Sequence, residues 1–379
     1  SGYVPGEGVG AVILKPLDRA LEDSDQIYCV IKASAINHGG KTNGFTVPNP
    51  KAQAELIAKT INKAGVDPRQ ISYIEAHGTG TSLGDPIEIA GLMNAFHSFG
   101  QDKQFCSIGS VKSNIGHLEA AAGIAGLTKI ILQLQHKKLV PTLHSVPVNS
   151  KINFEDSPFY LQRELGDWER PGYEKGGSKK AWPRMAAISS FGAGGANAHL
   201  IVEEYERRAV ANAQPSDKQG PQIYILSAKN SNRLIQAAEN MKTFLADNPD
   251  LVLSDVAYTL QVGREQFGKR IAIVADSREQ LVAALAKVVD GEAMPGVVFV
   301  DDEATSEMRG EILGRQTDEG ALVRELLDSG KLQQLAALWV TGAAVDWIKL
   351  RETDNGRALR ISLPTYPFAR NTCWVDTGN

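Results

Sequence analysis

The chain has 379 residues, of which 42% are hydrophobic and 22% are charged, a composition typical of a globular protein with room for two or three domains. Its net charge of −4 does not favour nucleic acid or an anionic membrane surface as a partner, and no apolar run reaches the ~18 residues of a membrane span. The opening residues SGYVPGEGVG lack the pattern of a signal peptide. Three cysteines, far apart and without a CxxC pair, predict reduced thiols in the cytoplasm, and no metal site is expected.

Apolar runs alternate with amphipathic stretches over the first 205 residues. The predicted strands cover residues 7–17, 27–36, 71–76, 105–111, 186–190 and 198–203. The predicted helices cover residues 54–64, 86–99 and 118–135. Asp85 and Glu88 have the spacing of a capping box for the second of these helices. Near-continuous apolar strands that alternate with helices indicate an α/β layered fold.

The rest of the chain is predicted to be organised separately. Residues 206–221 are polar, contain two prolines and are predicted to be a linker, and residues 222–350 are predicted to form a small α/β domain. One of its helices, 277–290, has a capping pair at Ser277 and Gln280. The leucine-rich stretch 319–340 would pack within this domain or contact a neighbouring molecule. Residues 351–379, which include LPTYPF, are predicted to form an extended strap.

Three glycine-rich motifs carry the chemistry. In ISYIEAHGTGTSLGDPIE (residues 71–88) an apolar strand ends at His77 and a glycine- and threonine-rich loop follows. In SVKSNIGH (residues 110–117) a second histidine, His117, again lies between a strand and a helix. SSFGAGGANAH (residues 189–199) adds a glycine-rich turn. In this order the motifs resemble the β-ketoacyl synthases, the condensing enzymes of fatty-acid and polyketide synthesis.

This resemblance implies a specific architecture. Residues 1–205 would be the C-terminal half of a thiolase-type αβαβα sandwich, and 222–350 the flanking α/β subdomain found in modular polyketide synthases. The strap 351–379, with Leu363, Tyr366, Phe368 and Trp374, would wrap back over the ketosynthase. No acyltransferase-sized segment and no GHSxG motif stand between them, which favours an assembly line whose acyltransferase is a separate protein.

The resemblance also implies a decarboxylative Claisen condensation between an acyl-cysteine and a malonyl unit on an acyl carrier protein. His77 and His117 would donate hydrogen bonds to the enolate oxygen, and Lys112 would lie inward and adjust their electrostatics. The backbone N–H of Ala193 would belong to the oxyanion hole. No cofactor would be bound directly, because the carrier protein delivers the phosphopantetheine arm.

Four further residues are expected to border that arm, namely Thr79, Thr81, Phe191 and Gly192. For the two threonines an alternative stays open, in which their hydroxyls bond their own loop. Asn197 and His199 are expected to be structural.

The family's nucleophilic cysteine is missing from its expected context in this chain. Cys29, Cys106 and Cys373 do not stand in a TACSS-like motif. We therefore expect the chain to be the C-terminal portion of the domain, to pair with an N-terminal half that carries the cysteine, and to be inactive alone. The complete domain is expected to be a homodimer. The alternative is a non-catalytic docking or scaffold fragment of the assembly line.

Three other enzyme classes fit the motifs poorly. GTSLG (residues 80–84) matches the G-x-S-x-G elbow of α/β-hydrolases, but that serine should follow its strand directly. A dinucleotide loop would require an acidic residue at the end of a second strand about 20 residues on. A degradative thiolase would require a second cysteine within SSFGAGGANAH.

Overall fold

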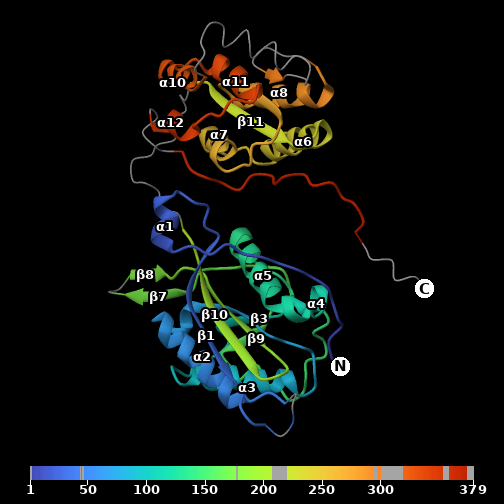
Figure 1. The fold of residues 1–379 in the computed structure, drawn as a ribbon. Coiled ribbons are helices and arrows are strands. Elements are labelled where there is room, and N and C mark those ends of the chain that lie inside the picture. The colour runs from blue at the N-terminus through green and yellow to red at the C-terminus, as the bar shows by residue number, and fades with distance from the viewer. Residues whose placement is uncertain are drawn as a thin grey trace, which may run out of the picture. The chain divides into compact units, whose positions relative to one another are not determined.

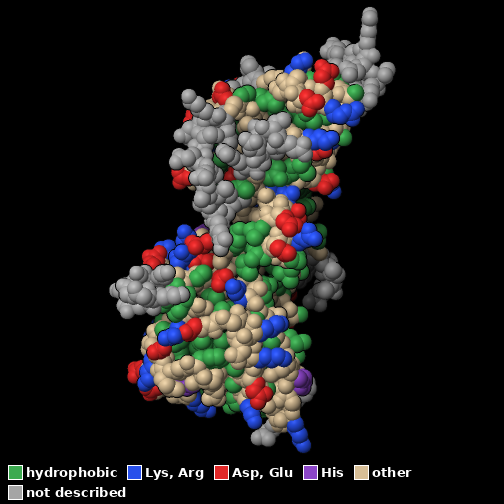
Figure 2. All heavy atoms as spheres, turned by 90° about the vertical axis from the view of Figure 1, so that its left-hand side faces the viewer, with side chains coloured by type: hydrophobic (Ala, Val, Ile, Leu, Met, Phe, Trp, Pro, Cys, Tyr) green, Lys and Arg blue, Asp and Glu red, His purple; other side chains and the backbone are tan. Residues whose placement is uncertain are grey.

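The computed structural model describes residues 2–42, 44, 47–175, 178–206, 220–292, 297–299, 319–352 and 358–373. The chain forms two compact units, one of Ser1–Leu17 and Ile27–Arg207 and the other of Asp18–Gln26 and Arg208–Asn379. One boundary falls in the predicted linker, of which residues 207–219 lie outside the described residues. Asp18–Gln26, expected within the domain of residues 1–205, belongs instead to the second unit. Among the described helices, none combines the length and the apolar character that crossing a membrane requires. On the face displayed in Figure 2, basic and acidic side chains are interspersed.

A six-stranded mixed sheet forms the centre of the first unit (Figure 1). Its strands, in spatial order, are β1 (Cys29–His38), β10 (Ala196–Glu204), β9 (Met185–Phe191), β2 (Ile71–Glu75), β3 (Cys106–Gly109) and β5 (Phe159–Leu161). β2 runs parallel to both β9 and β3, so the carboxyl ends of these three strands meet at one edge. Loops at this edge of a parallel sheet are a common place for a site.

Helices cover both faces of this sheet. Helices α2 (Pro50–Ala64) and α3 (Gly84–His97) lie on one side, and α5 (Ala122–His136) lies on the other (Figure 1). Successive residues of a strand point to opposite faces, so Ile74 packs with Ile57 and Leu92 whereas Tyr73 packs with Ile130. The predicted α/β layered fold is confirmed.

Short elements complete the first unit. They are the helix α4 (Lys112–Ile115), the 3₁₀ turns η1 (Pro68–Gln70) and η2 (Glu119–Ala121), and the strands β4 (Lys138–Leu139), β6 (Gly166–Asp167), β7 (Gly172–Lys175) and β8 (Ser178–Ala181).

The strand predicted at residues 7–17 is wrong. This segment has no regular structure before α1 (Leu17–Glu22), and the side chains of Val9 and Ile13 are each 98% exposed. An apolar run becomes a strand only when a neighbouring strand pairs with its N–H and C=O groups. Within the described residues no strand pairs with residues 7–16.

The second unit has a three-stranded antiparallel sheet in the order β11 (Gln222–Ala228), β12 (Lys269–Ala275), β13 (Val297–Phe299). Its helices are α6 (Ser231–Asp247), α7 (Leu253–Val262), α8 (Arg278–Asp290), α10 (Glu319–Ser329), α11 (Leu332–Val340) and α12 (Trp347–Glu352). Ser277 caps α8 by accepting the N–H of Gln280, as predicted. Leu326 and Leu335 are buried in the core of this unit, which confirms packing within the domain for the leucine-rich stretch.

The described part of the strap, residues 358–373, is extended and docks on the second unit. Arg264 donates hydrogen bonds to the carbonyls of Leu363 (3.1 Å) and Pro364 (3.3 Å). The ring of Tyr366 lies 5.1 Å from that of Phe267, and Leu363 joins the core. Trp374 lies outside the described residues, and the wrapping of the strap over the first unit stays a prediction.

Candidate active site

The two histidines of the glycine-rich motifs lie together at the carboxyl edge of the parallel strands. His77 follows β2 and His117 follows α4, and their ring centroids are 5.4 Å apart with an interplanar angle of 82°. The main-chain N–H of Phe191 donates to Nδ1 of His77 (3.4 Å), and that of Glu119 donates to Nδ1 of His117 (2.9 Å). A neutral imidazole whose Nδ1 accepts a hydrogen bond carries its proton on Nε2. Both rings are therefore set to donate from Nε2.

Burial, together with the nearby charge of Lys112, favours the neutral form of both imidazoles. The Nζ of Lys112 donates to the carbonyl oxygen of His77 (2.5 Å), so the ammonium group lies inward as predicted. Burial, followed by the charge of Lys112 and then His117, lowers the pKa of His77 to about 3. The pKa of His117 is also lowered, by burial and then by Lys112. At neutral pH the site therefore presents neutral hydrogen-bond donors beside the half-buried amine of Lys112.

Two carboxylates at the start of α3 hold the loop after His77. Glu88 accepts the main-chain N–H groups of His77 (2.7 Å) and Gly78 (2.9 Å). One oxygen of Asp85 accepts those of Thr79 and Gly80, both at 3.1 Å. The pKa of Glu88 is raised to about 7 because burial outweighs the two amide bonds.

The predicted capping box is therefore wrong. Leu83 precedes α3 without a side-chain cap, and Asp85 and Glu88 bond to the HGTG loop and not to their own helix. The residue pattern alone did not reveal this role. The signal in the sequence for this role was the position of Asp85 and Glu88 directly after the glycine-rich HGTG loop, whose N–H groups require acceptors.

The threonine hydroxyls bond within their own loop. The Oγ1 atoms of Thr79 and Thr81 lie 3.2 Å apart, and that of Thr81 accepts the N–H of Gly84 (3.0 Å). The structure thus shows the alternative in which the hydroxyls bond their own loop, and pantetheine binding stays a prediction.

The FGAGGA turn reaches the same edge of the sheet. Phe191 is buried with its ring 5.8 Å from that of His77, and the N–H of Gly192 donates to the carbonyl of Ala196 (2.7 Å). Ala193 lies exposed in the turn, and its role in an oxyanion hole stays a prediction. At Gly195, with φ of +92°, a Cβ would lie 2.9 Å from the ring of His38, so glycine is required there.

Asn197 and His199 are structural, as expected. Asn197 bonds to the side chain of Asn37 (3.1 Å), and the fully buried His199 bonds to Ser189 (3.0 Å).

Residues 2–6 also belong to the site, which the sequence did not reveal. The N–H of Gly2 donates to the carbonyl of Gly80 (2.8 Å), the N–H of His117 donates to the carbonyl of Val4 (2.8 Å), and the N–H of Gly6 donates to the carbonyl of His117 (2.9 Å). The ring of Tyr3 lies 4.7 Å from that of His117. Both histidine loops are thus bonded to one segment far away in sequence.

Cys29 and Cys106 do not have the surroundings of an activated nucleophile. Cys106 begins β3 and Cys29 begins β1, so both lie at the sheet edge opposite the histidines. Burial raises the pKa of both thiols, which disfavours the reactive thiolate. Cys373 is exposed on the strap, in the second unit. Among the described residues, no cluster of His, Cys, Asp and Glu could hold a metal ion.

Both units of the chain match known protein families. Residues 28–146 match the C-terminal domain of the β-ketoacyl synthases, and residues 225–292 match a RhiE-like KS-MAT linker domain. The chain is 48% identical over 99% of its length to polyketide synthase PksL of Bacillus subtilis, of which it spans 8%. It is 45% identical over 99% of its length to polyketide synthase ThaG of Burkholderia thailandensis, of which it spans 7%.

Solved ketosynthases have the same fold. The ketosynthase from module 6 of the bacillaene synthase of Bacillus subtilis, solved as a cysteine-to-serine variant, is 42% identical with a TM-score of 0.85, and the alignment covers 98% of this chain and 66% of that one. An oxazolomycin ketosynthase domain from Streptomyces albus is 40% identical with a TM-score of 0.81, over 99% of this chain and 59% of that one.

The chain therefore belongs to the β-ketoacyl synthases, and the thiolase-type fold predicted for its first unit is confirmed. More particularly, it is a polyketide-synthase ketosynthase segment followed by the linker subdomain of such synthases.

Proposed function

We propose that the first unit supplies the two enolate-stabilising histidines of a polyketide ketosynthase that elongates the chain by decarboxylative Claisen condensation. A malonyl thioester loses carbon dioxide, and the negative charge of the resulting enolate rests on the thioester oxygen. Carbon 2 of the enolate attacks the thioester carbonyl of an acyl-cysteine, a carbon–carbon bond forms, and the cysteine thiolate leaves. The observation that carries the proposal is that His77 and His117 both accept a main-chain N–H at Nδ1, which leaves two Nε2–H donors for one oxygen.

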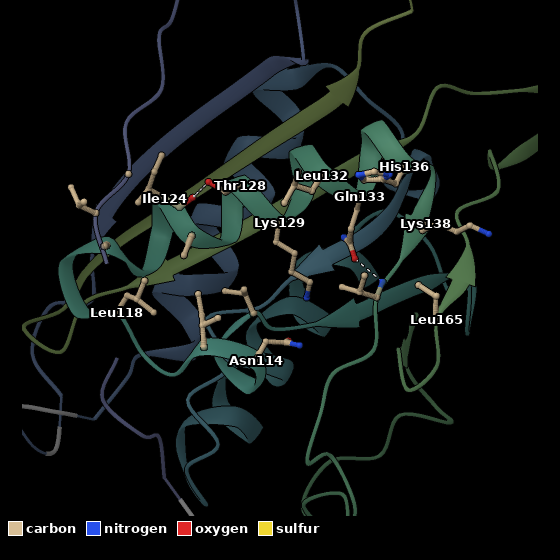
Figure 3. A pocket seen from close by; sticks show the side chains of 17 residues that line it. Asn114, Leu118, Ile124, Thr128, Lys129, Leu132, Gln133, His136, Lys138 and Leu165 are labelled. Carbon is tan, nitrogen blue, oxygen red and sulfur yellow. Dashed lines mark hydrogen bonds between the residues drawn. The ribbon is translucent and has the colours of Figure 1, made fainter. Parts of the chain in front are cut away.

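The nucleophilic cysteine is proposed to come from a ketosynthase segment other than this chain. The surroundings of Cys29 and Cys106 support this view, because burial raises the pKa of both thiols. A second support is an apolar pocket of about 600 Å³ along α5, lined by Leu118, Ile124 and Leu132 among others (Figure 3). Exposed apolar surface of this kind commonly marks a protein–protein interface. We propose that the segment carrying the cysteine covers it.

The carrier protein and the acyltransferase are part of the same proposal. The substrate would arrive on the phosphopantetheine arm of an acyl carrier protein, with Thr79, Thr81, Phe191 and Gly192 beside it and the N–H of Ala193 in the oxyanion hole. An acyltransferase on a separate protein would load that carrier. The complete domain would work as a homodimer in the cytoplasm, where its catalytic thiol stays reduced.

A second candidate function is a non-catalytic docking or scaffold segment of an assembly line. The observation that favours it is the burial of Cys29 and Cys106, which raises the pKa of both thiols. The neutral, paired donors of His77 and His117 favour the catalytic proposal, since a scaffold does not require them.

The two proposals are separated by His77→Ala in the complete ketosynthase. We expect acylation of the nucleophilic cysteine to continue and condensation with malonyl-carrier protein to fall by at least about 10²–10³-fold, the usual cost of one lost donor. Mass spectrometry of the loaded enzyme and of the product measures the two half-reactions. His97→Ala, at the other end of α3, is the control and should change neither. Condensation near the wild-type rate in His77→Ala would refute the catalytic role.

A further inference from the structure

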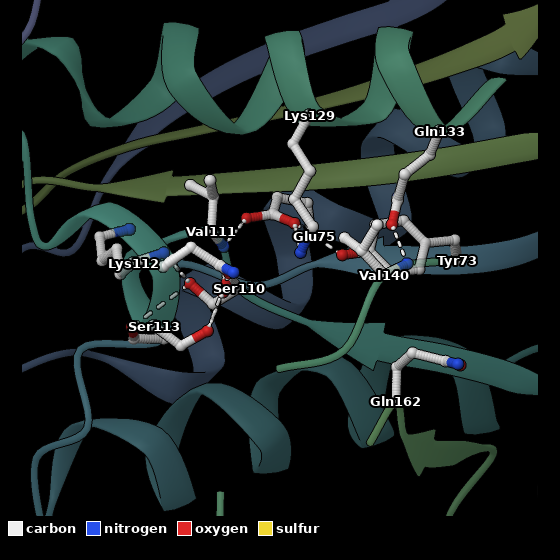
Figure 4. A network of polar contacts seen from close by, with 12 residues as sticks. Tyr73, Glu75, Ser110, Val111, Lys112, Ser113, Lys129, Gln133, Val140 and Gln162 are labelled. Carbon is white, nitrogen blue, oxygen red and sulfur yellow. Dashed lines mark hydrogen bonds and ion pairs between the residues drawn. The ribbon is translucent and has the colours of Figure 1, made fainter. Parts of the chain in front are cut away.

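A buried carboxylate beneath the site has no part in the chemistry described above. Glu75, the last residue of β2, is 2% exposed and accepts the main-chain N–H of Val111 at 2.6 Å. Its other oxygen accepts the hydroxyl of Tyr73 at 2.7 Å and lies 3.0 Å from Nζ of Lys129, which is 7% exposed (Figure 4). The three polar partners of this carboxylate are thus one main-chain N–H and two buried side chains.

The hydrogen bond between Glu75 and Val111 joins the end of β2 to the SVKSNIGH segment. Val111 precedes Lys112, and Nζ of Lys112 returns to the carbonyl of His77, two residues after Glu75. Between these two bonds, the N–H of Ala76 donates to the carbonyl of Gly109 (2.8 Å). The end of β2 and the SVKSNIGH segment are therefore bonded at three successive places.

Helix α5 completes the arrangement because it approaches the carboxylate closely. A Cβ at Gly126 would lie 3.0 Å from Cγ of Glu75 and 2.7 Å from Cδ1 of Ile188, so a larger residue there would push these side chains away. Lys129, one turn further along α5, then reaches Glu75. The ion pair compensates a charge that would otherwise be buried alone.

We infer that Glu75 is a positioning residue for condensation, which holds the His77 and Lys112 loops in register by accepting the N–H of Val111, while Lys129 and Tyr73 fix the carboxylate. This inference rests on the proposed function. The inference goes beyond the proposed function because it makes Glu75, which contacts neither the substrate nor a histidine, responsible for the geometry of the two Nε2–H donors.

Two double variants of the complete ketosynthase test the inference, Glu75→Gln/Lys129→Met and Glu75→Met/Lys129→Met. Both remove the ion pair as a unit, which avoids a lone buried charge. Glutamine keeps an oxygen for the N–H of Val111, whereas methionine does not. We expect condensation to be about 10²-fold slower with methionine than with glutamine, the usual cost of a small misplacement, while cysteine acylation is equal in both.

A spectroscopic readout accompanies the rates. With ¹⁵N-labelled histidine, the glutamine variant should keep the single Nε2–H form of His77, and the methionine variant should show mixed ring forms. Glu204→Gln is the control, because it breaks a buried ion pair with Arg184 (2.8 Å) at the other end of the sheet. It should lower the melting temperature without changing the ratio of condensation to acylation.

Equal condensation in the two double variants would overturn the inference, as would a parallel loss of acylation and condensation with methionine. If the wild-type domain loads acyl groups but does not condense them, the proposed function fails. The ring form of His77 in the two variants then still decides the role of Glu75.

Discussion

Two main-chain N–H groups determine which ring nitrogen of each site histidine carries the proton. Phe191 follows His77 by more than a hundred residues, yet its N–H determines which ring nitrogen of His77 carries the proton. For His117 the same task falls to Glu119, only two residues away. The two histidines thus reach one protonation state by a long-range contact and by a local one.

At the residue scale, the structure predicts that His77 stays neutral well below the usual histidine range. Its folded pKa of about 3 lies below the unfolded value near 6.5, so acid favours the unfolded state. Its contribution to stability is therefore present above pH 6.5 and is lost as the pH falls towards 3. Proton-detected ¹⁵N spectra of labelled histidines should show the Nε2–H form of His77 unchanged from about pH 7.5 to about pH 5. A midpoint near 6.5 would contradict the prediction.

Residue types and spacing were sufficient to predict that His77 and His117 lie at one site and that Lys112 lies inward. The catalytic roles of these residues stay a prediction. Residue types and spacing were not sufficient to predict what Asp85 and Glu88 bond to. Carboxylates at this spacing can cap their own helix or accept N–H groups of the preceding loop, and the structure shows the second arrangement. Nor could the residue pattern reveal Glu75, which in sequence is one polar residue at the end of an apolar strand. Its role depends on Val111 and Lys129, which come near it only after folding.

At the scale of elements, strands were predicted correctly where a neighbouring strand among the described residues pairs with them. β2, β3, β9 and β10 pair with one another, and their apolar runs were predicted correctly within a few residues. Residues 7–17 have an equally apolar pattern but no partner among the described strands. Hydrophobic pattern reports what a segment can bury, and the neighbouring segment decides whether it becomes a strand.

The strap offers a prediction at the same scale. Leu363 is 6% exposed and belongs to the core of the second unit, whereas Phe368 on the same strap is 77% exposed. Leu363→Ala should lower the free energy of unfolding by about 2–5 kcal/mol, because it leaves a cavity. Phe368→Ala, the matched control, should change it by no more than about 0.5 kcal/mol. Urea unfolding measures both, and equal values would show that the strap is not anchored through Leu363.

For the whole molecule, the distribution of apolar surface predicts how the chain behaves alone. Val9 and Ile13 are almost fully exposed, and the pocket along α5 is open and apolar. We expect the purified chain to bind the dye ANS and, when mixed with an acyl thioester, to show no added mass on any cysteine. Burial raises the pKa of Cys29 and Cys106, which suppresses their thiolates. Loading of any cysteine at the rate of an intact synthase would contradict both this prediction and the proposed source of the nucleophile.

The backbone bonds of residues 2–6 also limit how such synthases can be recombined. Gly2, Val4 and Gly6 bond to the loops of Gly80 and His117, and at Gly116 a Cβ would lie 2.8 Å from the carbonyl of Val4. A hybrid with its junction inside this segment would join one parent's backbone to the other parent's histidine loops. Residues 2–6 and 77–117 therefore behave as a single block for exchange, although residues 7–76 separate them in the sequence.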